Sequence, residues 1–309
     1  MSADRQLIGL GCAVLTALAA WVPGKLHAAD NCGPLLSAAL PAQVVQGGIV
    51  RGKLPEAGQL TMLGDPAGSN GALAIRTVRV GPKGDFVFGV GRDDAGPVRL
   101  HLEQADGTSC EATVAIIARQ WKLERVDGVP ESTVEPPPEI AARIEREQAQ
   151  VARARDRDDD RDDFAVPFDW PLTGRISGVY GSQRIYNGKP KSPHSGLDVA
   201  APKGRPVLAP AAGIITFARP DLYLTGGTVL VDHGHGLSSS FLHLSRLDVV
   251  VGQRVEQGQA IGLVGATGRA TGPHMHWGMN WFGVRVDPQL LVDPARNPGP
   301  TPSVSAPSR

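Results

Sequence analysis

The sequence has no surplus of charge of either sign. Its 309 residues include 31 lysines and arginines and 31 aspartates and glutamates, so the formal net charge is zero. Without a basic surplus there is no general attraction to nucleic acid or anionic lipid, and we predict no nucleic-acid partner. Aromatic residues are also scarce, at 5%, whereas there are 38 glycines and 26 prolines. This balance favours turn-rich β architecture over a helical bundle.

Cysteine is rare as well, with three in the chain. The first, Cys12, lies in a predicted leader, which leaves Cys32 and Cys110 in a compartment that permits disulfides. We predict a disulfide between these two, worth roughly 4 kcal/mol in the chain-entropy model because the loop it closes is long. Two buried free thiols are the alternative. We assign neither cysteine a catalytic or metal-binding role.

The leader is predicted from the first 30 residues. Arg5 precedes an apolar stretch over residues 7–22, and small residues follow at Ala28-Ala29. This layout is typical of a signal peptide over residues 1–29, and it predicts a periplasmic or secreted protein. The stretch is shorter than the ~20 apolar residues that cross a bilayer, so we expect no stable membrane span after cleavage. Retention as an uncleaved anchor is the alternative.

The rest of the chain reads as two β-rich regions joined by a helix. In the first region apolar residues alternate, as at Phe86, Phe88 and Val90, and turn residues separate the runs, which predicts strands with one buried face. We interpret the acidic run over residues 156–163 as a solvated linker, because consecutive carboxylates repel one another. The predicted segments are a β-sandwich-like domain over 30–122, a linker over 123–163 with a helix at 139–155, a second β domain over 164–295, and a disordered tail over 296–309.

Two His-x-His pairs occur in the second β region. His233-Gly-His235 alternates histidine with glycine after a valine-rich strand, which is turn composition, and we assign it no ligand role. His274-Met-His276 begins a predicted strand, in which alternate side chains share a face, so both imidazoles point the same way. The second pair is therefore the candidate for metal binding.

A further histidine and a carboxylate are spaced for the same purpose. His194 and Asp198 lie four residues apart, and Gly196 and Val199 between and after them argue against a helix. On a strand this even spacing keeps both side chains on one face. Zinc prefers imidazole nitrogen and carboxylate oxygen, and a catalytic zinc site has three protein ligands with the fourth position left for water. An ordinary hydrogen bond between the two residues is the alternative.

Taken in order, three segments resemble the lysostaphin-type (LytM-like) zinc metalloendopeptidases. The segments are Pro193-His-Ser-Gly-Leu-Asp198, Ser240-Phe-Leu-His243-Leu-Ser245 and Thr271-Gly-Pro-His274-Met-His276-Trp277. The resemblance extends over residues 174–291. The upstream Trp170-Pro-Leu-Thr segment and the β-domain-plus-helix arrangement are similar to Gram-negative periplasmic members with an N-terminal β-domain. A mainly β protein is implied, with an N-terminal β-sandwich-like domain, a connecting helix and a C-terminal antiparallel, barrel-like sheet.

The resemblance also implies an activity and a set of roles. It implies one zinc ion per chain, held by His194, Asp198 and His276, with His243 and His274 as the catalytic histidines. The implied reaction is hydrolysis of peptide cross-links of bacterial peptidoglycan by metal-activated water. The alternative is a non-catalytic LytM-like regulator that binds and activates a cell-wall amidase. Divisome or amidase partners stay open.

Two other expectations complete the analysis. Arg184 and Tyr186 lie shortly before the first predicted ligand, and we predict that they border the substrate groove, with a packing role as the alternative. The repeated Gly-Gln spacing at Gly252 and Gly258 is also similar to biotinyl or lipoyl carrier domains. A carrier needs a modifiable lysine, and no lysine occurs from Val207 onward, so this function is excluded.

Overall fold

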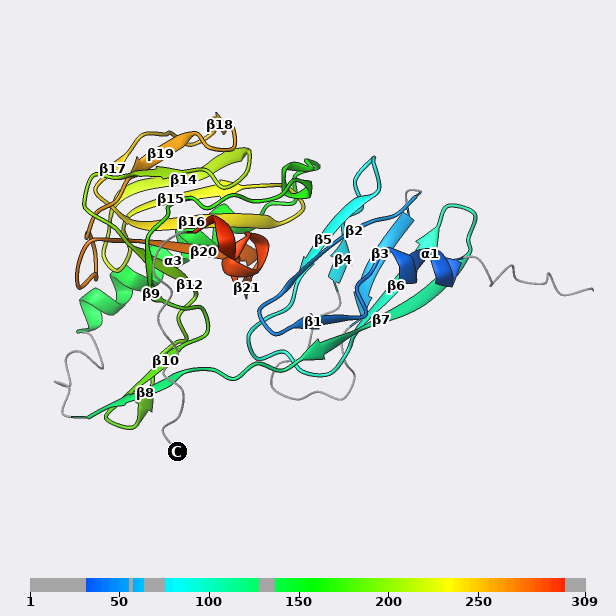
Figure 1. Ribbon diagram of the computed structural model, residues 1–309, viewed down its shortest axis with the longest axis horizontal. Coiled ribbons are helices and arrows are strands. Elements are labelled where there is room, and N and C mark those ends of the chain that lie inside the picture. The colour runs from blue at the N-terminus through cyan, green and yellow to red at the C-terminus, as the bar shows by residue number, and fades with distance from the viewer. Residues whose placement is uncertain (1–31, 56–57, 64–75, 128–136, 298–309) are drawn as a thin grey trace, which may run out of the picture.

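The computed structural model describes residues 32–55, 58–63, 76–127 and 137–297 (Figure 1). The predicted signal peptide over residues 1–29 and positions 298–309 of the predicted tail lie outside these ranges. The fold is mainly β, as the sequence predicts. No helix within the described ranges combines the length and apolar character that a membrane span requires.

Two sheets at the N-terminal end share an apolar core, and we call them the N-terminal sandwich (Figure 1). Alternation builds the core: Val98, Leu100 and Leu102 are buried along one strand while the residues between them are partly exposed. One sheet has the order β1-β7-β6-β3-β4, and the other pairs β2 with β5. The elements are α1 (Cys32–Ala38), β1 (Gln43–Val45), β2 (Ile49–Lys53), β3 (Gly58–Leu63), β4 (Arg76–Val78), β5 (Asp85–Gly89), β6 (Val98–Gln104) and β7 (Ser109–Ile117).

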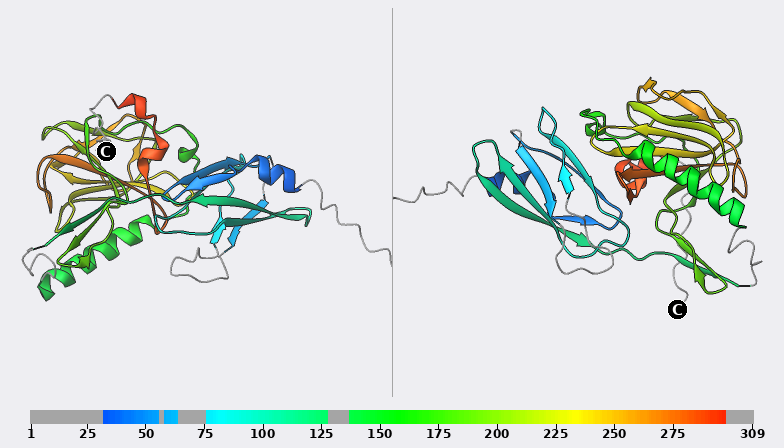
Figure 2. Two further views of the ribbon diagram at one scale, coloured as in Figure 1. Left: turned by 60° about the horizontal axis from the view of Figure 1, so that its bottom comes forward. Right: turned by 180° about the vertical axis from the view of Figure 1, so that it is seen from behind.

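The chain then crosses to the second half through a strand and a helix. β8 (Leu123–Val126) pairs in parallel with β10, a strand about 60 residues later in the chain. The helix α3 (Pro138–Arg155) begins at the last of three consecutive prolines and packs on β14 and β15 (Figure 2, right). Its contact residues Val151 and Ala154 lie against the small apolar cluster of Phe217, Leu222 and Leu230.

The second half contains one large sheet, which we call the C-terminal sheet, with the order β18-β14-β15-β16-β20-β12-β9 and β21 beside β20. Among the described residues this path does not close into a barrel. The strands of the second half are β9 (Arg175–Gly178), β10 (Gln183–Tyr186), β11 (Lys189–Pro190), β12 (Gly196–Ala200), β13 (Pro206–Leu208), β14 (Gly213–Leu222), β15 (Gly226–Asp232), β16 (Leu237–Leu244), β17 (Arg246–Leu247), β18 (Arg254–Val255), β19 (Ala260–Leu263), β20 (His274–Trp281) and β21 (Val284–Val286). Of these, β10 and β11 form a sheet with β8, and β13, β17 and β19 form a smaller sheet of their own. Three short 3-10 helices are η1 (Asp163–Ala165), η2 (Pro288–Leu291) and η3 (Pro294–Arg296).

The acidic run makes ion pairs that its composition does not indicate. Asp158 accepts two hydrogen bonds from Arg79, at 2.8 and 3.0 Å, and Asp162 lies 2.7 Å from Lys83. Both cations belong to the turn region between β4 and β5, so the run joins the N-terminal sandwich to the second half. The side chains of Asp158 and Asp162 stay 42% and 47% exposed, and their partners are some 79 residues away in the chain.

Candidate metal centre

The candidate site lies on two neighbouring strands of the C-terminal sheet. β12 and β20 are antiparallel, and their register places Asp198 opposite His276 and Ala200 opposite His274. Directly opposite residues share a face, so the carboxylate and both imidazoles emerge on the same side of the sheet. The alternate residues of β20, Met275 and Trp277, are fully buried on the other side. The core thus fixes the register that assembles the site.

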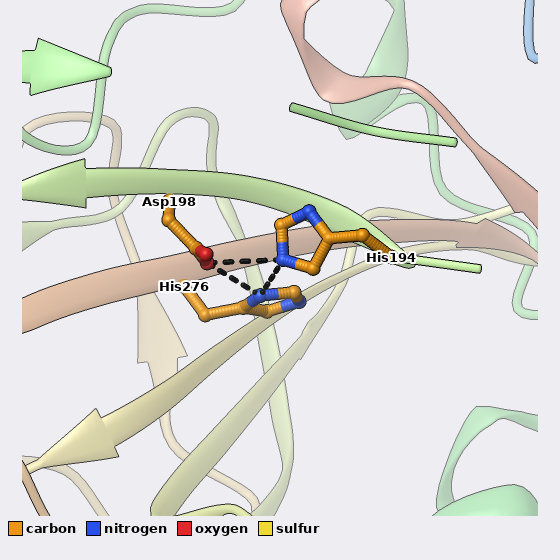
Figure 3. A group of neighbouring side chains, drawn as sticks. All are labelled: His194, Asp198 and His276. Atoms are coloured by element: carbon orange, nitrogen blue, oxygen red, sulfur yellow. Dashed lines mark hydrogen bonds and ion pairs between the residues drawn. The ribbon is translucent and has the colours of Figure 1, made fainter. Parts of the chain in front are cut away.

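Three of the predicted residues converge on one point (Figure 3). Nε2 of His194 is 3.1 Å from Oδ1 of Asp198 and 3.0 Å from Nδ1 of His276. Nδ1 of His276 is 2.9 Å from the same carboxylate oxygen. His194 arrives from the segment just before β12, so the three donors come from both strands and the approach to one of them. Among the described residues this is the one His/Cys/Asp/Glu group spaced to hold a metal ion.

The ring nitrogen of His194 that does not face the cluster makes a hydrogen bond that fixes the tautomer of the ring. Its Nδ1 is 3.0 Å from the carbonyl oxygen of Val179, and a carbonyl only accepts, so Nδ1 carries the hydrogen and donates. A lone pair is then left on Nε2, the atom that faces Asp198 and His276. Such a carbonyl partner on the second ring nitrogen is the usual arrangement for a metal-binding histidine.

Charge in the cluster favours a cation. Burial raises the pKa of Asp198, but its close contacts with His194 and His276 outweigh burial and hold that pKa well below the usual range. Burial lowers the pKa of His276 to about 4, so this ring is neutral near pH 7. Burial also lowers the pKa of His194, yet the hydrogen bond and charge of Asp198 shift it upward overall. The site therefore offers an ionised carboxylate and imidazole nitrogen donors to a positive ion.

The donor set fits zinc. Two imidazole nitrogens and one carboxylate oxygen suit zinc better than calcium or magnesium, which prefer oxygen ligands. Ligand atoms about 2.0–2.1 Å from one ion at tetrahedral angles lie ~3.3 Å apart. The separations of 3.1, 3.0 and 2.9 Å among His194, Asp198 and His276 are close to that spacing. A set of three protein ligands also leaves room for solvent or substrate.

Two more histidines border the cluster, and each is held by a backbone carbonyl. Nδ1 of His243 lies 2.8 Å from the carbonyl oxygen of Thr267, and Nδ1 of His274 lies 2.8 Å from that of Gly272. The two rings are 4.8 Å apart between centroids, and Nε2 of His274 is 3.9 Å from Oδ1 of Asp198. Burial lowers the pKa of His243. Because Nδ1 donates in both rings, each neutral ring keeps the lone pair of Nε2 available as a base.

Two glycines to which the sequence analysis gave no role in the site, Gly178 and Gly196, make room for the cluster. A Cβ at Gly178 would lie 2.3 Å from Oδ2 of Asp198, and a Cβ at Gly196 would lie 2.8 Å from Nε2 of His276. Gly178 is opposite Asp198 in the β9–β12 register. For Gly178, a glycine that faces a ligand across a strand pair is the signal, but it requires the register, which the sequence alone does not supply.

The remaining predicted residues lie apart from the cluster. Arg184 and Tyr186 are on β10, where Arg184 donates to Glu124 at 3.2 Å and to the Tyr186 hydroxyl at 3.4 Å. Their assignment to the groove stays a prediction. Cys110 on β7 is disulfide-bonded, and α1, which begins at Cys32, packs on β7. The pairing of these two cysteines stays a prediction too.

The histidines of the other pair are buried in a turn. Nδ1 of His233 donates to the carbonyl of Ala212 at 2.7 Å, and Nε2 lies 2.9 Å from the Ser239 hydroxyl. Burial lowers the pKa of His233 to about 4. His235 has a positive φ of 47° and lies 3.5 Å from Asp160. Both rings are thus part of the packing around the acidic run.

Comparison with known proteins places this geometry in a family. Residues 192–288 match the model of Peptidase family M23. A solved structure described as a peptidase M23 from Pseudomonas aeruginosa is 32% identical, with a TM-score of 0.57, and the match covers 84% of this chain and 99% of that one. The chain belongs to peptidase family M23. The resemblance predicted from the three histidine-containing segments is therefore confirmed.

Curated relatives of this M23 peptidase match it over part of its length. Peptidoglycan DD-endopeptidase ShyA of Vibrio cholerae is 41% identical over 104 residues, which are 33% of this chain and 24% of ShyA. DD-carboxypeptidase/endopeptidase Mpg of Neisseria meningitidis is 44% identical over 102 residues, 33% of this chain and 23% of Mpg. Cell division protein DipM of Caulobacter vibrioides is 37% identical over 128 residues, 41% of this chain and 20% of DipM. The M23 chain thus spans about a quarter or less of the length of these relatives.

Proposed function

We propose that this M23 peptidase is a zinc-dependent endopeptidase that hydrolyses peptide cross-links of bacterial peptidoglycan. The proposal rests on one observation: Nε2 of His194, Oδ1 of Asp198 and Nδ1 of His276 all lie within 3.1 Å of one another. Family membership supports peptidase chemistry. Relatives named as peptidoglycan DD-endopeptidases support peptidoglycan as the substrate class and a bond between D-amino acids as the bond cut.

In this proposal His194, Asp198 and His276 hold one zinc ion. When bound, zinc would lower the pKa of a water molecule from 15.7 to about 7 and polarise the scissile carbonyl. The protein's own part is to keep the donor atoms in place: the Val179 carbonyl holds His194 in the Nδ1–H tautomer, and the register of β12 and β20 holds Asp198 opposite His276.

The two bordering histidines move the protons. Nε2 of His243 or His274 accepts a proton from the attacking water, since each ring already donates through Nδ1 to a backbone carbonyl. The ring that has become protonated at Nε2 then donates to the tetrahedral oxygen or to the leaving amine. The 4.8 Å between the ring centroids lets both act on one reacting centre. Each carbonyl partner keeps the ring from turning away between turnovers.

The substrate also suggests where the protein acts. Peptidoglycan lies outside the inner membrane, so we propose a periplasmic or secreted location, in agreement with the signal peptide predicted over residues 1–29. Mass spectrometry of muropeptides released from purified sacculi identifies the bond that is cut. Products from cleavage between two D-amino acids support the proposed specificity, whereas products from any other bond contradict it.

The test of the activity is a comparison of two histidine variants. His276→Ala removes one proposed ligand, and His101→Ala removes a histidine of β6 in the N-terminal sandwich and serves as the matched control. We expect wild type and His101→Ala to contain about one zinc per chain and to digest purified peptidoglycan, and His276→Ala to lose both properties. A folded wild type that neither binds zinc nor digests peptidoglycan, yet stimulates an added cell-wall amidase, would establish the regulator instead.

A further inference from the structure

A tight turn holds the first residue of the cluster by three hydrogen bonds. The turn spans Val179 to Ser182, with Gly181 at a φ of +78°. The Val179 carbonyl accepts from Nδ1 of His194 at 3.0 Å, and the Ser182 carbonyl accepts from the His194 backbone N–H at 2.8 Å. The Gly181 N–H donates to the His194 carbonyl at 2.9 Å. Both the backbone and the ring of His194 are therefore placed by this one turn.

The other side of the turn is held by residues of the N-terminal half. Nε of Arg92, just after β5, donates to the Gly181 carbonyl at 2.9 Å. The ring of Trp121, between β7 and β8, lies close against Gly181, since a Cβ at Gly181 would be 2.2 Å from the nearest ring atom. Trp121 also meets the Tyr180 ring edge to face at 5.8 Å. Gly181 is therefore required twice, for its positive φ and for this close approach.

Two guanidinium groups lie over the ring of Trp121. Arg92 lies 5.1 Å and Arg119 lies 4.6 Å from its ring centre. Arg119 continues the connection, since its Nη1 donates at 2.9 Å to Asp287, whose side chain is almost fully buried. Planar guanidinium groups stack on an indole ring more favourably than on other side chains. The ring that supports the turn therefore has little freedom to move.

Tyr180 ties the same turn to the body of the protein. Its side chain is 3% exposed, and its hydroxyl donates to the carbonyl of Arg285 at 2.8 Å. A Cβ at Gly47, a residue of the N-terminal sandwich, would lie 2.6 Å from the Tyr180 ring. The turn is thus clamped between the two halves of the chain. A cavity of about 330 Å³ next to it is lined both by Arg92 and by His194.

We infer that Arg92 and Trp121 are positioning residues for the metal centre: they set the turn that orients His194. The inference rests on the proposed function, in which His194 is a zinc ligand. Partners of metal-binding histidines typically change metal affinity 10- to 100-fold, and these two residues act one step further out. We therefore expect their removal to weaken zinc binding by about 10-fold. The N-terminal half would then be part of the metal site rather than a separate module.

The experiment measures zinc affinity of the full chain by competition with a chromophoric chelator. The variants are Arg92→Gln, Trp121→Ala and Trp121→Phe, with His194→Ala as the ligand knockout. Arg79→Gln is the matched control, because Arg79 also joins the N-terminal half to a later segment, through Asp158, but does not contact the turn. Long-range 1H–15N spectra of the histidine rings in the zinc-free protein report the tautomer of His194, and thermal unfolding reports whether each variant folds.

Three results support the inference together. Arg92→Gln and Trp121→Ala bind zinc about 10-fold more weakly, Trp121→Phe and Arg79→Gln stay within about twofold of wild type, and His194 loses its single Nδ1–H tautomer in the weakened variants. Wild-type affinity and an unchanged tautomer in folded Arg92→Gln overturn the inference, even if Trp121→Ala does not fold. The proposed function survives that outcome, because the wild type still binds zinc. A wild type without measurable zinc affinity overturns both.

Discussion

A methyl group added at Gly178 should damage the metal centre without straining the backbone. The new Cβ would lie 2.3 Å from Oδ2 and 2.9 Å from Cγ of Asp198. Ordinary contacts begin near 3.4 Å, so Oδ2 must move by about 1 Å. Rotating the carboxylate away also moves Oδ1, which lies 3.1 Å from His194 and 2.9 Å from His276. Functional sites tolerate about 0.5 Å, and a 1 Å misplacement can cost about 100-fold in rate.

We therefore expect Gly178→Ala to lower kcat/KM on purified peptidoglycan by about 100-fold and zinc affinity by about 10-fold or more. The control is Gly283→Ala, in the turn between β20 and β21, where a Cβ would meet nothing within 4 Å. Chelator competition and release of soluble muropeptides measure the two effects, and thermal unfolding verifies that both variants fold. If Gly178→Ala binds zinc and digests peptidoglycan as the wild type does, the reasoning from close contact to ligand geometry is wrong.

Three further predictions concern single side chains. His243→Ala and His274→Ala should keep zinc but lose roughly 100- to 10,000-fold in kcat, and loss of zinc instead would make either residue a ligand. Burial holds the pKa of His233 at about 4 against 6.5, so between these values only the unfolded chain binds the proton and stability falls as pH falls. The free energy of unfolding in urea should drop by roughly 2 kcal/mol more from pH 7.5 to pH 5 in wild type than in His233→Gln, and equal drops would contradict this origin. Phe241→Ala, at a fully buried position of β16, should cost about 3–5 kcal/mol by chemical denaturation, and a loss below about 1 kcal/mol would indicate that the core refills the space.

Local patterns were sufficient to place the three converging residues on one face. His274 and His276 share a face because strand side chains alternate, and the even spacing of His194 and Asp198 predicts the same for them, although the structure places His194 just before β12. What brings the two segments together is the antiparallel pairing of β12 and β20. No local pattern specifies that pairing, and at that step the resemblance to a family supplied what the residues alone did not.

The contacts that surround the site could not be predicted, because they join distant parts of the chain. Nothing near Trp121 in the sequence indicates that its ring lies against Gly181. The acidic run shows the same limit: its composition indicates a linker but does not indicate that Asp158 and Asp162 pair with cations of the N-terminal sandwich. The composition of a segment does not reveal which residues distant in the sequence the fold places beside it.

The two faces of strand β20 have different roles. One face presents His274 and His276 to the metal centre, and the other packs Met275 and Trp277 into the core. A shift of its pairing by a single residue would exchange them, burying two imidazoles and exposing a methionine and an indole. A chain with this register shift would lose both the core packing and the metal-binding face, so we expect it to be both unstable and inactive. We therefore expect single-residue insertions in this strand to be more damaging than changes in the length of the exposed turn at Gly283, which follows it.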